Sequence, residues 1–162
     1  MALSFVDASP EERAEVAQLL GREPAGRFAV IVRRASGAAV VIENEPHLRD
    51  GTPMPTLYWL VDETLHDAVS RLESESGVHR YELLVDTEEL ALAHDTYATR
   101  RAAAVVRHDL VQPSGGVGGT RVGVKCLHAH LANFLVHGDD PVGALVAQTL
   151  DVSNLVVVQT RA

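Results

Sequence analysis

Three side chains able to bind a metal or take part in a reaction lie close together in the chain: Cys126, His128 and His130. Zinc accepts both thiolate and imidazole ligands, and a thiol near a histidine and a helix N-terminus can become a nucleophile. The apolar spacing predicts a helix over Val124 to Val136. At about 100° per residue, Cys126 and His130 share one stripe of that helix and His128 points elsewhere. Cys126 and His130 are therefore the candidate metal ligands.

Two residues cannot complete a metal site, so other ligands would have to come from elsewhere, such as His94 or His108. The alternative is a buried thiol and a hydrogen-bonded histidine in the core, because free cysteine is among the most buried residue types. The single thiol and a spacing unlike that of zinc fingers predict no tightly bound structural zinc, and the sequence assigns no cofactor. Cys126 and His128 are the candidates for a catalytic role.

A glycine-rich loop, Gln112 to Gly123 (QPSGGVGGTRVG), precedes this helix. Exposed backbone N–H groups at a helix N-terminus attract anions, and nearby cations can add to the attraction. We therefore expect a small phosphate-like anion to bind here; the alternative is a mobile surface loop without a ligand. The loop is not a Walker A motif, because no Gly-Lys-Ser/Thr follows at the required spacing. The candidate binding residues are Gly115, Gly116, Gly118, Gly119, Arg121 and Lys125.

The helical and strand patterns along the chain predict a single α+β domain over residues 1–162, with the glycine-rich loop internal rather than a domain linker. Strands are expected at Phe28 to Arg33, Ala39 to Ile42 and Thr56 to Val61, forming an antiparallel sheet of about three strands. Pro46 to Pro55 is expected to be a crossing loop. Four or five helices follow the helical spacing, and Leu155 to Val158 is a last strand or a docked extension.

Three local expectations concern polar and aromatic side chains. The His94, Tyr97 and Arg101 stripe on a long helix is expected to be a solvated face. Tyr58 and Trp59 alternate along a strand, so one should be core and the other should line a surface or cleft. Asp140 precedes a proline and is predicted to cap the last helix, a role that serine could also fill.

Composition and net charge exclude some classes of function. The chain has 162 residues, 46% of them hydrophobic, and a formal charge of −8, which argues against nucleic acid as a partner. It lacks both an apolar run long enough to span a membrane and a secretory signal, and it has one cysteine, so we expect a cytoplasmic protein. The sequence leaves the oligomeric state open.

Four blocks together resemble the bacterial family called domain of unknown function 501. They are Asp50 to Tyr58 (DGTPMPTLY), Ser70 to Glu73 (SRLE), Ala93-His94 with Tyr97, and Val124 to His128 (VKCLH). The resemblance spans roughly Val16 to Gly143 and implies no established activity. Genes of this family often lie beside those of septum formation initiator and exopolyphosphatase in actinobacteria, which implies a link to cell division or envelope processes.

Three functions therefore remain. The leading expectation is a protein that binds a small anion at the glycine-rich loop and the Lys125 to His128 block. The second is a noncatalytic protein-interaction factor, and the third is a Cys/His metal-binding protein. Whether the protein is an enzyme stays open.

Overall fold

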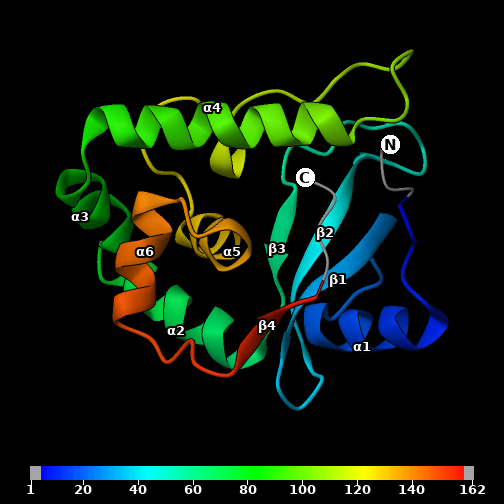
Figure 1. Ribbon diagram of the computed structural model, residues 1–162, viewed down its shortest axis with the longest axis horizontal. Helices are drawn as coiled ribbons and strands as arrows, with labels where there is room; N and C mark the ends of the chain where they lie inside the picture. The colour runs from blue at the N-terminus through cyan, green and yellow to red at the C-terminus, as the bar shows by residue number, and fades with distance from the viewer. Residues whose placement is uncertain (1–4, 159–162) are drawn as a thin grey trace.

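The computed structural model describes residues 5–158 and contains a four-stranded antiparallel sheet in the order β3-β2-β1-β4, with six α-helices (Figure 1). The α+β class is as predicted; the sheet has one strand more and the helices number one or two more than expected. In chain order the elements are α1 (Pro10–Leu20), β1 (Gly26–Arg34), β2 (Ala39–Leu48), β3 (Tyr58–Leu60), α2 (Glu63–Ser74), α3 (Gly77–Leu84), α4 (Thr87–Ala104), the 3₁₀ turn η1 (Val117–Gly119), α5 (Leu127–His137), α6 (Pro141–Gln148) and β4 (Leu155–Val157).

Strand β2 is longer than predicted because it continues through Pro46 to Leu48. The pairing of β1 with β2 shifts register between Gly26 and Phe28, and this irregularity accommodates a residue that cannot donate a ladder hydrogen bond. The segment from Leu155 to Val157 is a strand that pairs with Val32 to Arg34 of β1. β3 and β4 are therefore the two edges of the sheet.

The sheet separates two apolar layers. Helix α1 covers one face, where Val16 packs with Phe28 and Ile42. Helix α5 lies near the centre of the other face, surrounded by α2, α4 and α6 (Figure 1). Leu127 and Leu131 of α5 are fully buried in this larger core. The polar side chains at the start of α5 thus lie between the sheet and α2.

Two helix boundaries affect the site. Glycine commonly ends a helix, but Gly77 is instead the first residue of α3, where a Cβ atom would lie 2.2 Å from the carbonyl oxygen of Leu72. Helix α5 begins at Leu127 rather than Val124, and its N-cap residue Cys126 has an extended backbone (φ −148°). Because Cys126 lies outside the helix, the helical-wheel argument that paired it with His130 does not apply.

Within residues 5–158, no helix is long and apolar enough to cross a membrane.

Candidate metal centre

Glu73, Cys126 and His128 bring three metal-binding atoms to one point, all within 4.8 Å of one another. In the part of the chain that the structure describes, this is the only such group of three or more Cys, His, Asp or Glu residues. Glu73 lies in the last turn of α2, and the other two residues lie at the start of α5. Ligand atoms around a tetrahedral zinc are about 3.5 Å apart. A modest closure of the three side chains would therefore suffice to hold an ion.

The two ring nitrogens of His128 face different partners. Nε2 lies 3.1 Å from the carbonyl oxygen of His66 and 3.1 Å from Oγ of Ser70. A carbonyl can only accept, so Nε2 carries the proton in the bond to His66. In the neutral ring Nδ1 then presents a lone pair, 3.0 Å from Oε1 of Glu73 and 3.9 Å from Sγ of Cys126. Nδ1 and the carboxylate oxygen are then both acceptors and repel each other unless a proton or a metal cation lies between them. Metal-binding histidines are typically held in this way, with the other ring N–H on a carbonyl or carboxylate.

Glu73 is also fixed in place. Its Oε2 accepts a hydrogen bond of 3.1 Å from the backbone N–H of Leu127, the first residue of α5. This contact satisfies one of the free N–H groups at the helix start. Oε1 is thereby directed toward His128. The side chains of Glu73 and His128 are 25% and 17% exposed, so solvent can reach the pair.

Cys126 does not have the geometry of a Cys-His-acid catalytic triad. In such a triad the thiol and the acid engage opposite nitrogens of the histidine. Here both Cys126 and Glu73 approach Nδ1 of His128. Burial raises the pKa of the Cys126 thiol, and the charge of Glu73 raises it further. The thiol is therefore protonated near neutral pH without a cation, whereas a bound cation would favour the thiolate.

His130 lies elsewhere. It is fully buried, and its Nδ1 is 2.9 Å from both carboxylate oxygens of Asp140. Asn133 donates to the same carboxylate, which also caps α6 by accepting from the N–H of Gly143. The predicted cap is present, and the predicted pairing of Cys126 with His130 is replaced by that of Cys126 with His128.

The other histidines considered as ligands do not join the cluster. His94 accepts from the N–H of Val117 through Nδ1, and its Nε2 donates to the carbonyl of Gly123, so both ring nitrogens have partners. Burial lowers the pKa of His94, which keeps the ring neutral at pH 7. His108 lies on the surface beyond the end of α4.

The glycine-rich loop is held by the protein's own side chains. Arg101 donates to the carbonyls of Pro55 and Gly115 at 2.8 and 2.7 Å. At Gly116 a Cβ atom would lie 2.5 Å from Nδ1 of His94, so the close packing of loop and ring requires glycine. The loop's backbone is thus turned toward buried partners.

The remaining candidate anion ligands are spread along the loop. Gly118 has a left-handed φ of +69° and lies beside Cys126, where its Cβ would be 3.6 Å from the cysteine Cβ. Gly119 has a φ of +81° and lies on the surface. Arg121 and Lys125 are also exposed.

The stripe of His94, Tyr97 and Arg101 is buried, so its interpretation as a solvated face is wrong. The hydroxyl oxygen of Tyr97 accepts from the N–H of Leu57 at 2.5 Å, and burial raises the pKa of Tyr97 to about 12. The stripe holds the loop and the start of β3. The polar pattern was visible in the sequence, but its burial depends on how α4 packs.

The cluster borders an open cleft of about 330 Å³ at the β3 edge of the sheet. Tyr58 is fully buried, whereas Trp59 is partly exposed and lines this cleft, as their alternation predicts. Cys126, just before α5, and His128, in its first turn, lie in the wall of the cleft. The lining residues are Leu20, Arg22, Thr56, Tyr58, Trp59, Leu60, His66, Gly118, Cys126, His128 and Ala129.

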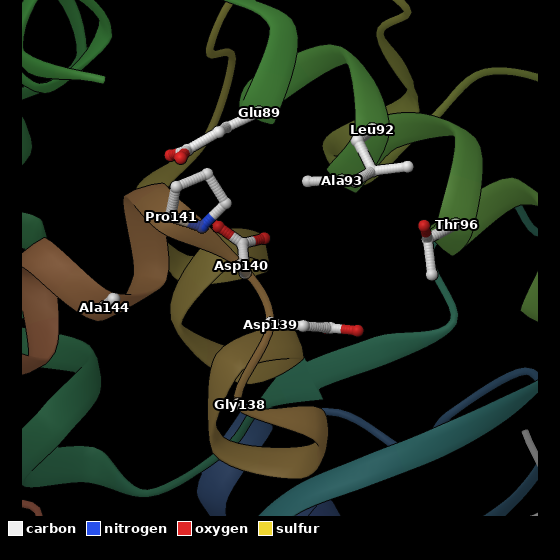
Figure 2. Close-up of a pocket in the computed structure, with 9 residues that line it drawn as sticks. All are labelled: Glu89, Leu92, Ala93, Thr96, Gly138, Asp139, Asp140, Pro141 and Ala144. Carbon is white, nitrogen blue, oxygen red and sulfur yellow. The ribbon is translucent and has the colours of Figure 1, made fainter. Parts of the chain in front are cut away.

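A second hollow, of about 250 Å³, lies between α4 and the connection from α5 to α6. Figure 2 shows Glu89 and Thr96 on one side of it and Asp139 and Asp140 on the other. Both aspartates have internal partners, since Asp139 pairs with Arg100 at 2.6 Å and Asp140 binds His130. The two aspartates therefore support the structure rather than a ligand.

A family model described as a protein of unknown function (DUF501) matches residues 30–148. The chain belongs to the DUF501 family. No curated protein and no solved structure matches it. The match begins in β1 and ends in α6, so it includes every residue of the metal-binding cluster.

Sequence reasoning missed Glu73 as a possible ligand in this DUF501 chain. A signal was present, because His66, Ser70 and Glu73 recur at positions i, i+4 and i+7 and share one face of α2. Ser70 and Glu73 are also the first and last residues of the SRLE block that supports the family resemblance. The sequence could not show that this face lies against the start of α5.

Proposed function

We propose that this protein binds a divalent metal ion, most favourably zinc, through Oε1 of Glu73, Sγ of Cys126 and Nδ1 of His128. The observation that carries the proposal is the convergence of these three atoms while Nε2 of His128 is occupied by the carbonyl of His66. Carboxylate, thiolate and imidazole together form a ligand set typical of zinc.

Three protein ligands leave one tetrahedral position for water or a bound molecule, which is the pattern of catalytic rather than structural zinc sites. Cys126 and His128 both line the cleft, so this position would be reached from there. A metal at this point would act as a Lewis acid toward a bound ligand. This proposal is compatible with the expectation that the chain holds no structural zinc.

The anion expected at the glycine-rich loop is better assigned to the neighbouring cleft. Arg101 and His94 engage the glycine-rich loop from within, and Arg121 and Lys125 are exposed side chains. Gly118 is the one candidate glycine that lines the cleft. A small anion is therefore better placed in the cleft than on the loop. The alternative of a protein-interaction factor linked to cell division stays a prediction.

Cobalt(II) provides a direct test, because a cobalt–thiolate bond gives a charge-transfer absorption band in the near ultraviolet. We expect the metal-free protein to bind cobalt and zinc at one ion per chain, and Cys126→Ser to abolish the band. His128→Gln should weaken zinc binding at least about tenfold. His108→Gln is the matched control and should bind zinc as the wild type does, because His108 lies on the surface outside the cluster.

Calorimetric zinc titration of the same proteins completes the test. Equal zinc affinity in wild type, Cys126→Ser and His128→Gln would disprove the proposed site. Circular dichroism of each metal-free variant checks that the fold is retained.

A further inference from the structure

Arg22 is the one arginine that lines the cleft beside the proposed metal centre, and no lysine lines it. Arg22 directly follows Gly21 at the end of α1. Its guanidinium carbon lies 5.3 Å from the ring centroid of Trp59. An arginine that stacks on an aromatic face keeps the N–H groups at its edge available. Within residues 5–158, no carboxylate lies within ion-pair distance of Arg22. Its charge is therefore available to a ligand.

The cleft walls combine this cation with apolar surface. Leu20 and Leu60 line the cleft together with Trp59, and the cysteine and histidine of the metal cluster lie in the same cleft. Its volume of about 330 Å³ is near the lower end of the range for small-molecule sites. A ligand with an anionic group at one end and a short apolar body matches these walls.

The neighbouring charges limit the length of the ligand. A hollow of about 590 Å³ shares Leu20, Leu60 and His66 with the cleft. Its other lining residues include the acids Glu15, Glu63 and Asp67. A long polyanion extending along both hollows would meet like charge, so the charges favour a small anion confined to the cleft.

We propose that the cleft binds a small organic anion, a carboxylate or phosphate ester, whose charged group is held by Arg22 and whose other end faces the metal position. This inference extends the proposed function by naming the ligand class, and the contact with Arg22 can be tested without metal. Arginine binds both carboxylate and phosphate groups through paired N–H donors. A short apolar body then packs against Trp59 and Leu20.

Trp59 is the only tryptophan of the chain, so its fluorescence reports directly on the cleft. The probes are acetate, hexanoate and inorganic phosphate, each titrated into metal-free and zinc-loaded protein at constant ionic strength. We expect saturable changes, with hexanoate binding several-fold more tightly than acetate because of its apolar body. Comparison of acetate with phosphate distinguishes the two anionic groups. Arg22→Gln should weaken binding of every probe at least about tenfold.

Arg121→Gln and Lys125→Gln are the matched controls, because each removes an exposed cation that does not line the cleft. Both should bind the probes as the wild type does. Loss of binding in these variants but not in Arg22→Gln would overturn the inference and place the anion at the glycine-rich loop. Absence of any saturable change in metal-free and zinc-loaded protein would also overturn it.

The failures of the two proposals are distinguishable. Zinc titration measures the metal site without an anion, and the fluorescence of metal-free protein measures the anion site without zinc. Arg22-dependent binding in a protein that does not bind zinc would support the anion cleft and reject the metal centre. Zinc binding without an Arg22-dependent response would support the metal centre and reject the anion cleft.

Discussion

Nδ1 of His128 lies 3.0 Å from Oε1 of Glu73, so two helices distant in sequence present their polar side chains to each other at a solvent-accessible point. The opposite ring nitrogen of His128 is held by the carbonyl of His66. The second oxygen of Glu73 is held by the N–H of Leu127. Each side chain therefore has one end anchored and the other directed at its neighbour, an arrangement that favours a shared cation.

Glu73→Gln should weaken zinc binding at least about tenfold while leaving the metal-free fold nearly unchanged. The glutamine oxygen can still accept the hydrogen bond from Leu127, whereas the negative charge beside His128 is lost. Because both side chains are partly exposed, the change in their contact should cost less than about 1 kcal/mol of unfolding free energy. Zinc titration and urea unfolding measure the two effects.

Glu75→Gln is the control for this substitution, since Glu75 is exposed at the end of the same helix. It removes the same charge and should leave zinc affinity unchanged. If both variants lost affinity equally, a general charge effect would explain the result and Glu73 would not be a ligand.

Asp140→Ala should destabilise the protein by about 3 kcal/mol, more than the loss of a helix cap alone. The carboxylate caps α6, but it also binds His130 and Asn133, and all three side chains are buried. Its removal leaves two buried polar groups without that partner. Asp140→Ser, expected from the sequence to retain most of the stability, should recover the cap but not both buried contacts. Urea unfolding should place it clearly below the wild type, and a wild-type value would contradict this assignment.

Arg34→Gln should lower stability by about 1 kcal/mol at pH 7, and its effect should disappear in acid. Burial alone would raise the pKa of Asp62, but the hydrogen bonds from Arg34 and from the N–H of Leu65 outweigh it and hold the pKa below its ordinary value. The pair therefore stabilises the fold above the unfolded pKa of about 3.9, and this contribution is lost as pH falls through the lower folded pKa. Unfolding of both proteins at a series of pH values tests this. A constant difference down to pH 2 would exclude the ionised Asp62 as the cause.

The sequence predicted the elements better than it predicted which of their faces meet. The cap at Asp140 follows from local residue order and accepts the expected backbone hydrogen bond. Ser9 and Asp62 cap α1 and α2 in the same way. The hairpin of β1 and β2 follows from apolar runs around a glycine turn. The extension of β2 through Pro46 depends on a register shift in its partner strand, which residue order does not reveal.

The candidate site could be predicted only in part for the same reason. Cys126 and His128 are near one another in sequence, but their contact requires an extended residue immediately before the helix. A helix start misplaced by three residues rotates the predicted direction of Cys126 and pairs it with the wrong histidine. Glu73 lies far away in sequence and joins the cluster only through the packing of α2 against α5. Such long-range packing is not encoded in local periodicity.

Arg101→Met should destabilise the protein by about 2–4 kcal/mol and loosen the glycine-rich loop. The buried guanidinium binds the carbonyls of Pro55 and Gly115, and methionine would fill much of its volume without donating to either. Amide hydrogen exchange should therefore quicken at Gly116 and Val117, whose N–H groups are bonded in the native loop. Arg100→Met is the matched control, because the neighbouring arginine makes an exposed pair with Asp139 and should cost less than about 1 kcal/mol. Equal costs for the two variants, with unchanged loop exchange, would show that Arg101 does not anchor the loop.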